Sequence, residues 1–515
     1  MEILFVATSN YDDPFSKEWH TDIRYTVSFL RHHGIKAVFI SKPIITDSKS
    51  LIETVTKMNP DNIFVHLTEE NLRTITRFLK TLKRVCPHIR AIAGGIPATL
   101  SGKKLLMQHP EIDWIIAGER DLVLLEIIQR LQKGQSYPDV QGLSSLEFYN
   151  EPRPLISNLD ILGEMIHDGI AELLQSTSDE NKVGYLLSSR GCYGRCGFCG
   201  IPGLYGSSRN SWRGRSVSAV VDELQHLSTI FGINYFVFED NNFFGPGNIG
   251  QERATNIAHE ILRRKINIRF FFCCRLNDIR RDSLCALKEA GLDGIGIGVE
   301  STNPDSLQLF QKGLRVEQIY PTLELLNEQR VKVEINMIFF DPYLTLEGVR
   351  NNLALLEYLR EKDLFFYSSS FPFNELKPFS WSPIANQLKT EGLLNEFEDT
   401  CYYRDPKVGI LAEWIRHIRS IILPVFKRRN CFYALKTSDT KKNLLTSAQS
   451  NILTASVRYW IGLYVLPRYL TIACDLLDEN ISDIKQQFEE LERKFIQEIS
   501  PLEKLREELS RVSSR

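Results

Sequence analysis

The chain has 515 residues, of which 43% are hydrophobic and 24% are charged, close to the averages of soluble globular proteins. This length is enough for two or three domains with sizeable cores. The formal net charge of -2 at pH 7 creates no overall field that would favour nucleic acid or an anionic membrane, so we expect neither as the main partner.

The sequence carries no recognisable secretion or membrane signal. Its first residues, MEILFVATSN, lack the basic start and the small-residue cleavage site of a signal peptide. The most apolar stretch, residues 459–477, is interrupted by Pro467, Arg468 and Asp475, so it is too short to cross a bilayer. We therefore expect a cytoplasmic protein without a membrane span, in which this stretch forms a buried or partner-facing helix.

Residues 1–140 alternate short apolar runs with helix-like stretches. The runs are ILFVAT, AVFI, NIFVHL, AIAGG and DWIIAGE, and the helices are expected around 25–33, 50–58, 70–85 and up to 131. Repeated strand–helix units with short loops are typical of a doubly wound parallel sheet, so we predict a Rossmann-like α/β domain. Residues 141–182 lose this periodicity, and Pro152 and Pro154 interrupt them, which indicates a linker.

A second strand–helix series covers residues 183–370. It begins with YLLSS and continues through YFVFED, IRFFFCC, GIGIG and VEINMIFF, with helices expected at 217–231, 254–265, 281–290, 316–329 and 346–360. Six such units predict a partial (β/α)6 barrel, in which active sites gather where strands end. Residues 371–515 are expected to be mostly helical, ending in an amphipathic charged helix over 481–511 that packs along one face.

The distribution of cysteines points to a metal site. Cys192, Cys196 and Cys199 stand at spacing C-x3-C-x2-C in a glycine-rich loop that directly follows an apolar strand. In a cytosolic chain such clustering indicates a metal or catalysis before disulfides. Three thiolates leave one iron of a cubane cluster without a protein ligand. A structural zinc site is the alternative, but the next histidine, His226, lies well along the following helix.

The cysteine spacing, with Phe198 directly before the third cysteine, resembles the radical S-adenosylmethionine (SAM) superfamily. The resemblance implies a [4Fe-4S] cluster whose open iron is chelated by SAM. It further implies that SAM is cleaved reductively to a 5'-deoxyadenosyl radical, which abstracts hydrogen from an unactivated carbon of the substrate. A reducing partner of the flavodoxin or ferredoxin type is implied as well.

Several downstream residues match the positions where the superfamily contacts SAM. Glu239 and Asp240 follow the strand FVFED, and Glu300 and Ser301 end the strand GIGIGVES. By resemblance we expect these four side chains to bind the cofactor, although each alone would also suit an ordinary capped loop. Residues Arg213 and Arg215, in WRGRS, could bind a carboxylate, but solvated surface arginines are an equal alternative.

The N-terminal region resembles the cobalamin-binding-like domain of the B12-type radical SAM subfamily. The resemblance rests on AIAGGIPATL and DWIIAGERD, and Gly94 and Gly95 stand where a doubly wound sheet binds ligands. No D-x-H-x-x-G occurs in the chain, so ligation of cobalt by histidine is not supported. Cobalamin binding therefore stays open, since the domain could instead position the substrate.

Two fates of the substrate radical compete. Cobalamin could donate a methyl group, or a thiol could return a hydrogen atom and invert the stereocentre. Cys401 lies in EDTCYYRDP after the barrel, and radical SAM peptide epimerases of the proteusin type use a donor cysteine in a similar place. This placement favours epimerisation of a ribosomal precursor peptide slightly over methylation. Cys273 and Cys274 are rival donors, and a buried inert cysteine is the alternative for all three.

The substrate cannot be read from the sequence beyond a peptide or small molecule. The aromatic segment 365–381 and the charged C-terminal helix could bind a leader peptide, although ordinary packing explains them equally well. A non-catalytic iron–sulfur or scaffold protein is the remaining alternative, and reductive cleavage of SAM discriminates it.

Overall fold

The computed structural model describes residues 2–7, 20–41, 44–175, 182–364, 373–395, 400–426, 465–478 and 484–512. The chain forms two compact units. One comprises Met1–Gly194, Cys199–Cys273 and Glu289–Gly291, and the other comprises Arg195–Phe198, Cys274–Lys288 and Leu292–Arg515.

The first sheet has six strands in the order β2-β1-β3-β4-β5-β6. They are β1 (Glu2–Ala7), β2 (Lys36–Ser41), β3 (Asn62–Leu67), β4 (Arg90–Gly95), β5 (Trp114–Ile116) and β6 (Leu143–Ser144). The first five pair in parallel, and β6 is antiparallel to β5. The order reverses between β1 and β3, which is the switch point where doubly wound sheets bind ligands. Because β6 belongs to this sheet, the sheet extends beyond residue 140.

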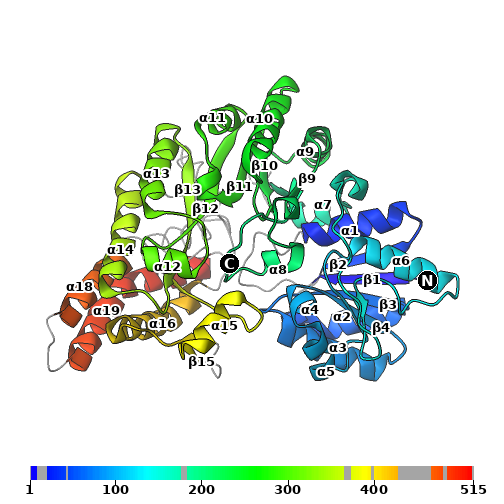
Figure 1. The fold of residues 1–515 in the computed structure, drawn as a ribbon, viewed down its shortest axis with the longest axis horizontal. Helices are drawn as coiled ribbons and strands as arrows, with labels where there is room; N and C mark the ends of the chain where they lie inside the picture. Colours follow the sequence, from blue (N-terminus) through cyan, green and yellow to red (C-terminus); the bar gives the residue numbers. More distant parts are fainter. Residues whose placement is uncertain are drawn as a thin grey trace. The chain divides into compact units, whose positions relative to one another are not determined.

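Helices cover both faces of this sheet. Helices α1 (Thr21–His32) and α6 (Asp121–Gln132) lie on one face, and α2 (Ile44–Met58) and α3 (Leu72–Val85) lie on the other (Figure 1). The short helices α4 (Ile96–Leu100) and α5 (Gly102–Gln108) follow β4. The α2/α3 face holds a core that includes Leu4, Val65 and Leu79, all without exposed surface. Burial of such side chains is the main stabilising contribution of this domain.

A second sheet has six strands in the order β14-β13-β12-β11-β10-β7. They are β7 (Val183–Leu186), β10 (Tyr235–Phe238), β11 (Arg269–Arg275), β12 (Leu292–Glu300), β13 (Lys332–Phe340) and β14 (Asn374–Glu375). The pairings of β7 with β10, β10 with β11, β12 with β13 and β13 with β14 are parallel. The predicted partial barrel is therefore confirmed, and β14 extends it beyond residue 370.

The helices between these strands agree closely with the periodicity of the sequence. They are α9 (Val217–Phe231), α10 (Gly247–Arg263), α11 (Arg281–Glu289), α12 (Pro304–Leu309), α13 (Ile319–Glu328) and α14 (Leu346–Glu361). Short 3-10 helices precede or follow them: η1 (Leu159–Leu162), η3 (Arg209–Ser211), η4 (Leu276–Asp278) and η5 (Val316–Gln318). Helix α7 (Ile170–Gln175) is short and lies within the expected linker.

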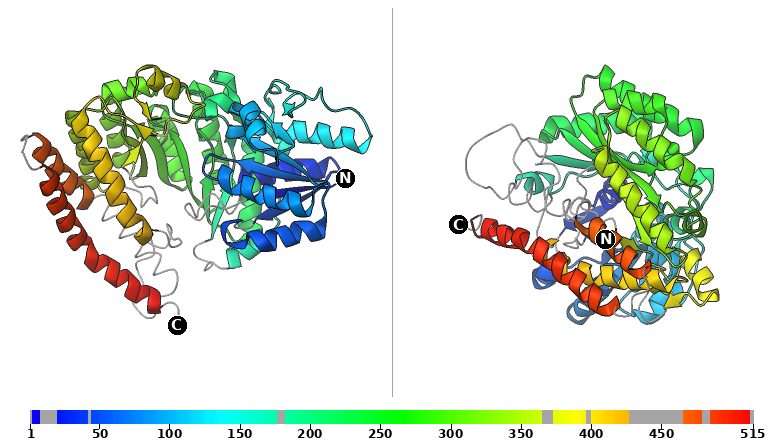
Figure 2. Two further views of the ribbon diagram at one scale, coloured as in Figure 1. Left: turned by 90° about the horizontal axis from the view of Figure 1, so that it is seen from below. Right: turned by 90° about the vertical axis from the view of Figure 1, so that its left-hand side faces the viewer.

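The C-terminal region is mostly helical, as expected. It contains α15 (Pro383–Thr390), α16 (Pro406–Phe426), α18 (Leu466–Asp478) and α19 (Ile484–Val512), and a small hairpin of β15 (Leu394–Asn395) and β16 (Thr400–Cys401). Helices α18 and α19 pack together, and α16 lies against α18 (Figure 2). The predicted amphipathic helix is α19, whose Phe488, Leu491 and Phe495 are buried.

Helix α18 buries Leu470 and Cys474, and no helix in the described ranges is long and apolar enough to cross a membrane. Residues 459–464 and 365–372 lie outside the described residues, so the proposed leader-peptide role of the aromatic segment is not addressed by the structure.

Candidate functional site

The three clustered cysteines occupy a loop without regular structure. The loop follows β8 (Ser189–Arg190), which pairs antiparallel with β9 (Arg213–Gly214), and ends at α8 (Ile201–Tyr205). Gly191 makes the turn into the loop with a φ of 84°, and a Cβ there would collide with the carbonyl oxygen of Ser211. Only glycine fits such a turn, so Gly191 fixes the point at which the chain enters the cysteine loop.

Each of the three sulfur atoms lies beside an N–H donor. Gly194 N donates to Cys192 Sγ at 3.3 Å, Ile201 N donates to Cys199 Sγ at 3.5 Å, and Arg275 Nη1 donates to Cys196 Sγ at 3.4 Å. Hydrogen bonds to the ligand sulfur atoms tune iron–sulfur clusters. None of the cysteines that the structure describes forms a disulfide. The donor set fits a [4Fe-4S] cluster with one iron left open.

The turn after β10 holds the strand that leads into the loop. Asp240 accepts hydrogen bonds from Ser188 N at 2.7 Å, Ser188 Oγ at 2.5 Å and Ser189 Oγ at 2.8 Å, and Asn241 Oδ1 accepts one from Gly191 N at 3.1 Å. Burial raises the pKa of Asp240, against the opposing effect of the serine hydrogen bonds. Both oxygens of Asp240 are thus used within the protein, so this side chain positions the loop. Glu239 is half-buried, and its N donates to Leu186 O at 2.9 Å.

The middle of the loop, in the second unit, is anchored by backbone hydrogen bonds. Gly197 N donates to Phe310 O at 2.9 Å, and Ile384 N donates to Gly197 O at 3.2 Å. The ring of Phe198 packs edge to face on that of Phe310, with centroids 5.6 Å apart. Phe198 therefore has a structural contact that fixes the chain next to Cys199.

A buried ion pair lies close to Cys196. Glu300 ends β12, and its Oε1 lies 2.8 Å from Lys312 Nζ, with both side chains less than a tenth exposed. Burial alone would lower the pKa of Lys312, but the charges of Glu300 and Cys196 outweigh it and raise the pKa. Arg275 links the two features, because it donates to Cys196 Sγ through Nη1 and to the Lys312 carbonyl oxygen through Nη2.

The backbone at this ion pair is unusual. Glu300 has a φ of 67°, a left-handed conformation that is uncommon outside glycine and that persists mainly at functional sites. A Cβ at Gly298 would lie 2.5 Å from both Glu300 Oε1 and Lys312 Nζ, so glycine leaves the space that the pair occupies. Lys312 was not expected from the sequence. It stands 12 residues after Glu300, and no local pattern marks it.

Ser301 is fully buried in a network that begins α12. Its Oγ accepts a hydrogen bond from Asn303 N at 3.1 Å and lies 3.4 Å from Asn352 Oδ1 on α14. Asn303 caps the helix by accepting from Asp305 N. The hydroxyl of Ser301 is thus used to shape the turn after β12.

Charged residues of the first domain surround the strand before the cysteine loop. Arg190 Nη1 lies 2.6 Å from Asp121 Oδ2, and Arg190 Nη2 lies 2.8 Å from Asp22 Oδ1. Arg213 Nη1 lies 2.8 Å from Glu119 Oε2. Although burial alone would raise the pKa of Asp121, Arg190 lowers it. We call Asp22, Glu119, Asp121, Arg190 and Arg213 the loop-anchoring network.

The alternative of solvated surface arginines is wrong for Arg213 and Arg215. Both are buried, and Arg215 forms an ion pair with Glu223 on α9 and donates to Tyr25 Oη at 2.7 Å. Their carboxylate partners belong to the protein itself. Glu119, which pairs with Arg213, and Tyr25, which accepts from Arg215, lie far from both arginines in the chain. The sequence pattern WRGRS therefore gave no sign of either contact.

Cys401 lies in β16 and is 8% exposed. It belongs to an apolar cluster with Phe310, Leu376 and Ile384, against which Phe198 also packs. Burial raises the pKa of its thiol to about 12, so the group is protonated at neutral pH. Of the rival donors in β11, Cys274 is buried and Cys273 is half-buried.

The carboxyl edge of the first sheet carries Gly94 and Gly95 as the last residues of β4. Gly95 has a φ of 109°, and a Cβ there would collide with the carbonyl oxygen of Leu67. His66, near the end of β3, accepts a hydrogen bond on Nδ1 from Arg120 at 3.0 Å, and burial lowers its pKa to about 4. Gly95 is therefore required by the close approach of β4 to Leu67, and His66 is engaged with Arg120.

Comparison with protein families gives two matches within the chain. The radical SAM superfamily matches residues 186–356, and the B12 binding domain matches residues 19–128. The first range contains the cysteine loop and the ion pair of Glu300 with Lys312, and the second contains most of the first sheet.

The chain is similar to several curated proteins. It is 26% identical over 375 residues to an uncharacterized methyltransferase of Pyrococcus horikoshii, covering 71% of this chain and 78% of the relative. It is 23% identical over 331 residues to the anaerobic magnesium-protoporphyrin IX monomethyl ester cyclase of Rubrivivax gelatinosus, covering 61% of this chain and 58% of the relative. It is 26% identical over 362 residues to the 4'-phospho-dehydrooxetanocin synthase of Priestia megaterium, covering 64% of this chain and 47% of the relative.

Solved structures of low sequence identity share the fold. The cobalamin-dependent SAM radical enzyme OxsB with aqua-cobalamin aligns with a TM-score of 0.74 at 17% identity, covering 97% of this chain and 80% of that chain. The radical SAM methyltransferase TsrM from Kitasatospora setae, with cobalamin and a [4Fe-4S] cluster, aligns with a TM-score of 0.60 at 17% identity, covering 76% of this chain and 78% of that chain.

These matches agree with the cysteine loop, whose donor set fits a cluster, and with the order of the two domains. The family implies a [4Fe-4S] cluster and SAM as cofactors. The chain is thus an enzyme with a radical SAM domain over residues 186–356 and a B12-binding domain over residues 19–128 ahead of it.

Proposed function

We propose that this enzyme is a cobalamin-dependent radical SAM methyltransferase that acts on an unactivated carbon of a peptide or another natural product. The observation that carries the proposal is the B12-binding domain that precedes the radical SAM domain in one chain. One relative is named as a methyltransferase, which supports methyl transfer. When bound, the cluster and SAM supply a carbon radical and cobalamin supplies the methyl group.

The protein's own residues have distinct tasks in this proposal. Cys192, Cys196 and Cys199 hold the cluster. Arg275 donates a hydrogen bond to Cys196 Sγ and so fixes the position of this ligand. The buried ion pair of Glu300 and Lys312 presents opposite charges beside Cys196, as suits the ammonium and carboxylate of an amino acid.

In the first domain, the carboxyl edge at Gly94 and Gly95 would receive cobalamin through backbone contacts. Because His66 is engaged with Arg120, we propose that no histidine from this edge ligates the cobalt. The proposal includes a cytoplasmic location, where thiols stay reduced, and an electron donor of the flavodoxin or ferredoxin type.

The test uses the full chain, reconstituted anaerobically with iron and sulfide and then supplied with cobalamin, a low-potential chemical reductant and SAM that carries a trideuterated methyl group. Retained cobalamin, 5'-deoxyadenosine formation and transfer of the label to a candidate peptide or small molecule would support methylation. A protein that retains no cobalamin while it still forms 5'-deoxyadenosine would overturn it. Cys199→Ala is the negative control, because it removes a cluster ligand.

Epimerisation of a peptide ranks second. None of the relatives reported above carries an epimerase name, but Cys401 shares an apolar cluster with Phe198, next to the cysteine loop. A neutral thiol is the form that can donate a hydrogen atom, and Cys401 is protonated at neutral pH. Incorporation of one deuterium from heavy water at a substrate α-carbon, lost in Cys401→Ala, would favour this reaction over methylation.

A non-catalytic iron–sulfur protein would form no 5'-deoxyadenosine under the same conditions. The same measurement therefore separates a scaffold role from both radical reactions.

A further inference from the structure

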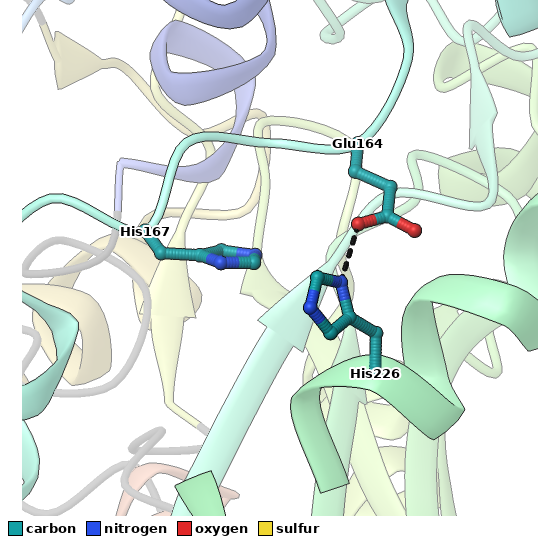
Figure 3. Close-up of side chains that lie close together, drawn as sticks. All are labelled: Glu164, His167 and His226. Carbon is teal, nitrogen blue, oxygen red and sulfur yellow. Dashed lines mark hydrogen bonds and ion pairs between the residues drawn. The ribbon is translucent and has the colours of Figure 1, made fainter. Parts of the chain in front are cut away.

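A group of metal-binding side chains lies apart from the cysteine loop, within the first unit. Glu164 and His167 stand between η1 and α7, and His226 projects from α9. One ligand atom from each of the three side chains lies within 4.8 Å of the other two (Figure 3). All three side chains are half-buried, so an ion could reach them from solvent.

Two of the three groups already interact. Glu164 Oε2 lies 2.6 Å from His226 Nδ1, with both side chains a little under two-fifths exposed. The rings of His167 and His226 have centroids 5.1 Å apart and planes inclined by 69°. Figure 3 shows the three side chains converging from two segments of the chain.

His167 lies beside this ion pair and has an unusual environment for a histidine that only packs against one. Its Nε2 is buried and has no hydrogen-bond partner among the residues that the structure describes. Burial and then the charge of His226 lower its pKa. The imidazole of His167 thus has a ring nitrogen that no group of the described residues occupies, and an imidazole nitrogen is the commonest metal ligand in proteins.

The backbone that carries Glu164 and His167 is held firmly. Met165 N donates to Glu223 Oε1 at 2.9 Å, and Arg24 Nη1 donates to Ile166 O at 3.1 Å. Both bonds are buried, and Glu223 also accepts from Tyr25 Oη at 2.6 Å. Such fixed support is what preorganises the ligands of metal sites.

We propose that Glu164, His167 and His226 bind one divalent transition-metal ion, for which zinc is the probe. Two imidazoles and one carboxylate suit zinc, and the remaining position would take water. Ligand atoms of tetrahedral zinc lie about 3.3 Å apart, given bonds of roughly 2.0–2.1 Å. The distance between Glu164 Oε2 and His226 Nδ1 would therefore increase by somewhat less than ~1 Å when the ion binds. Half-buried side chains can make this adjustment. An ion there ties the linker segment to α9.

The competing explanation is an ordinary ion pair between Glu164 and His226, packed against His167. The ion pair of His417 and Glu492 provides a matched comparison, because it has a similar length of 3.0 Å but no second histidine in a metal-binding group within the described part of the chain.

The experiment uses the untagged full chain with Cys192, Cys196 and Cys199 all replaced by alanine, so that thiolates cannot take up zinc. Zinc binding is measured by competition with a chromophoric chelator. We expect one zinc per chain, and an affinity loss of at least about 10–100-fold in His167→Asn and in His226→Asn, since even outer-shell changes cost this much. His417→Asn should bind zinc like its parent.

Zinc should also raise the melting temperature of the parent and of His417→Asn but not that of His226→Asn, because an ion that binds only the folded state stabilises it. A packing role alone would lower the melting temperature of His226→Asn with or without zinc. Equal zinc affinity in the parent and the variants, or no binding by the parent, would overturn the proposal.

If the triple alanine chain does not fold, wild-type enzyme with a reconstituted cluster replaces it. Zinc and iron are then counted separately in the wild type, His167→Asn, His226→Asn and His417→Asn. Loss of zinc in the first two variants alone, at unchanged iron, supports the site, and equal zinc in all four overturns it.

Discussion

The missing side chain of Gly298 leaves space for the ion pair of Glu300 and Lys312. In Gly298→Ala a Cβ would lie 2.5 Å from both charged groups, so one of them must move. Both groups end flexible side chains and can move apart, although separating two buried charges should also lower the free energy of unfolding. We expect the rate of 5'-deoxyadenosine formation, measured on folded protein, to fall by at least about tenfold, equivalent to the loss of about 1.4 kcal/mol.

Gly409→Ala is the matched control for this substitution. A Cβ at Gly409, in α16, would meet only Tyr403 at an ordinary 3.6 Å. Alanine also favours a helix, so stability should stay equal or rise slightly. Wild-type rates in both variants would show that the ion pair beside Cys196 has no part in SAM cleavage.

His66 should make the enzyme sensitive to acid. Burial lowers the pKa of His66 to about 4 in the folded protein, against about 6.5 in the unfolded chain, so the unfolded chain binds more protons between these values. The contribution of neutral His66 to the free energy of unfolding is fully present above pH 6.5 and is lost as the pH falls toward 4. At pH 5 the loss amounts to about 2 kcal/mol.

Urea unfolding at pH 7.5 and pH 5 measures this effect. His66→Gln can still accept the hydrogen bond from Arg120 but does not titrate, so its stability should fall less between the two pH values. An equal fall in both proteins would assign the acid sensitivity to other groups.

At the scale of elements, the loop-anchoring network joins α1 and the start of α6 to β8. In Asp121→Asn the buried Arg190 loses its nearest carboxylate but keeps Asp22 as a partner. A fully uncompensated buried charge typically costs about 3–5 kcal/mol, so we expect a smaller loss of about 1–3 kcal/mol in the free energy of unfolding. We also expect less iron per chain after reconstitution, because Arg190 lies two residues before Cys192.

Asp139→Asn is the control, since Asp139 forms an exposed ion pair with Arg130. Exposed pairs contribute about 0–1 kcal/mol, so this variant should behave like the wild type. Equal stability of Asp121→Asn and Asp139→Asn would show that the buried network is not what holds the strand.

The periodicity of the sequence predicted most helices well. The expected helices 217–231 and 346–360 correspond to α9 (Val217–Phe231) and α14 (Leu346–Glu361). Helix α10 begins at Gly247, seven residues before the expected 254, because GNIGQER has no apolar stripe. Such starts depend on tertiary contacts, which periodicity does not report.

The cluster ligands could be named from the sequence because they lie within eight residues and depend on local spacing. The other site residues could not, because their surroundings come from distant segments. Asp240 was expected to contact the cofactor, yet its oxygens accept hydrogen bonds from residues about 50 positions earlier. The group of Glu164, His167 and His226 likewise joins residues 62 positions apart.

At the scale of the whole molecule, the two cofactor domains should be separable by mutation. The cluster ligands lie in the radical SAM match, and the proposed cobalamin edge lies in the B12-binding match. We expect Cys199→Ala to lose the iron–sulfur absorbance and all SAM cleavage but to retain cobalamin like the wild type. Absorbance spectra and cobalamin counted by mass spectrometry check this. Loss of cobalamin at intact fold would show that the two sites depend on each other.

The reaction itself was the hardest inference from the sequence. A thiol after the barrel favoured epimerisation, whereas the B12-binding match and the methyltransferase relative favour methylation. A cysteine such as Cys401 looks the same in sequence whether it packs in a core or donates hydrogen. Only its position relative to the substrate separates the two roles.

The loop-anchoring network also limits how this enzyme can be recombined with its relatives. A chimera that replaces residues 1–182 by another B12-binding domain would keep Arg190 and Arg213 but lose Asp22, Glu119 and Asp121. The two arginines would then be buried without acceptors. A workable domain exchange must therefore supply carboxylates opposite Arg190 and Arg213, as Asp22, Glu119 and Asp121 do here.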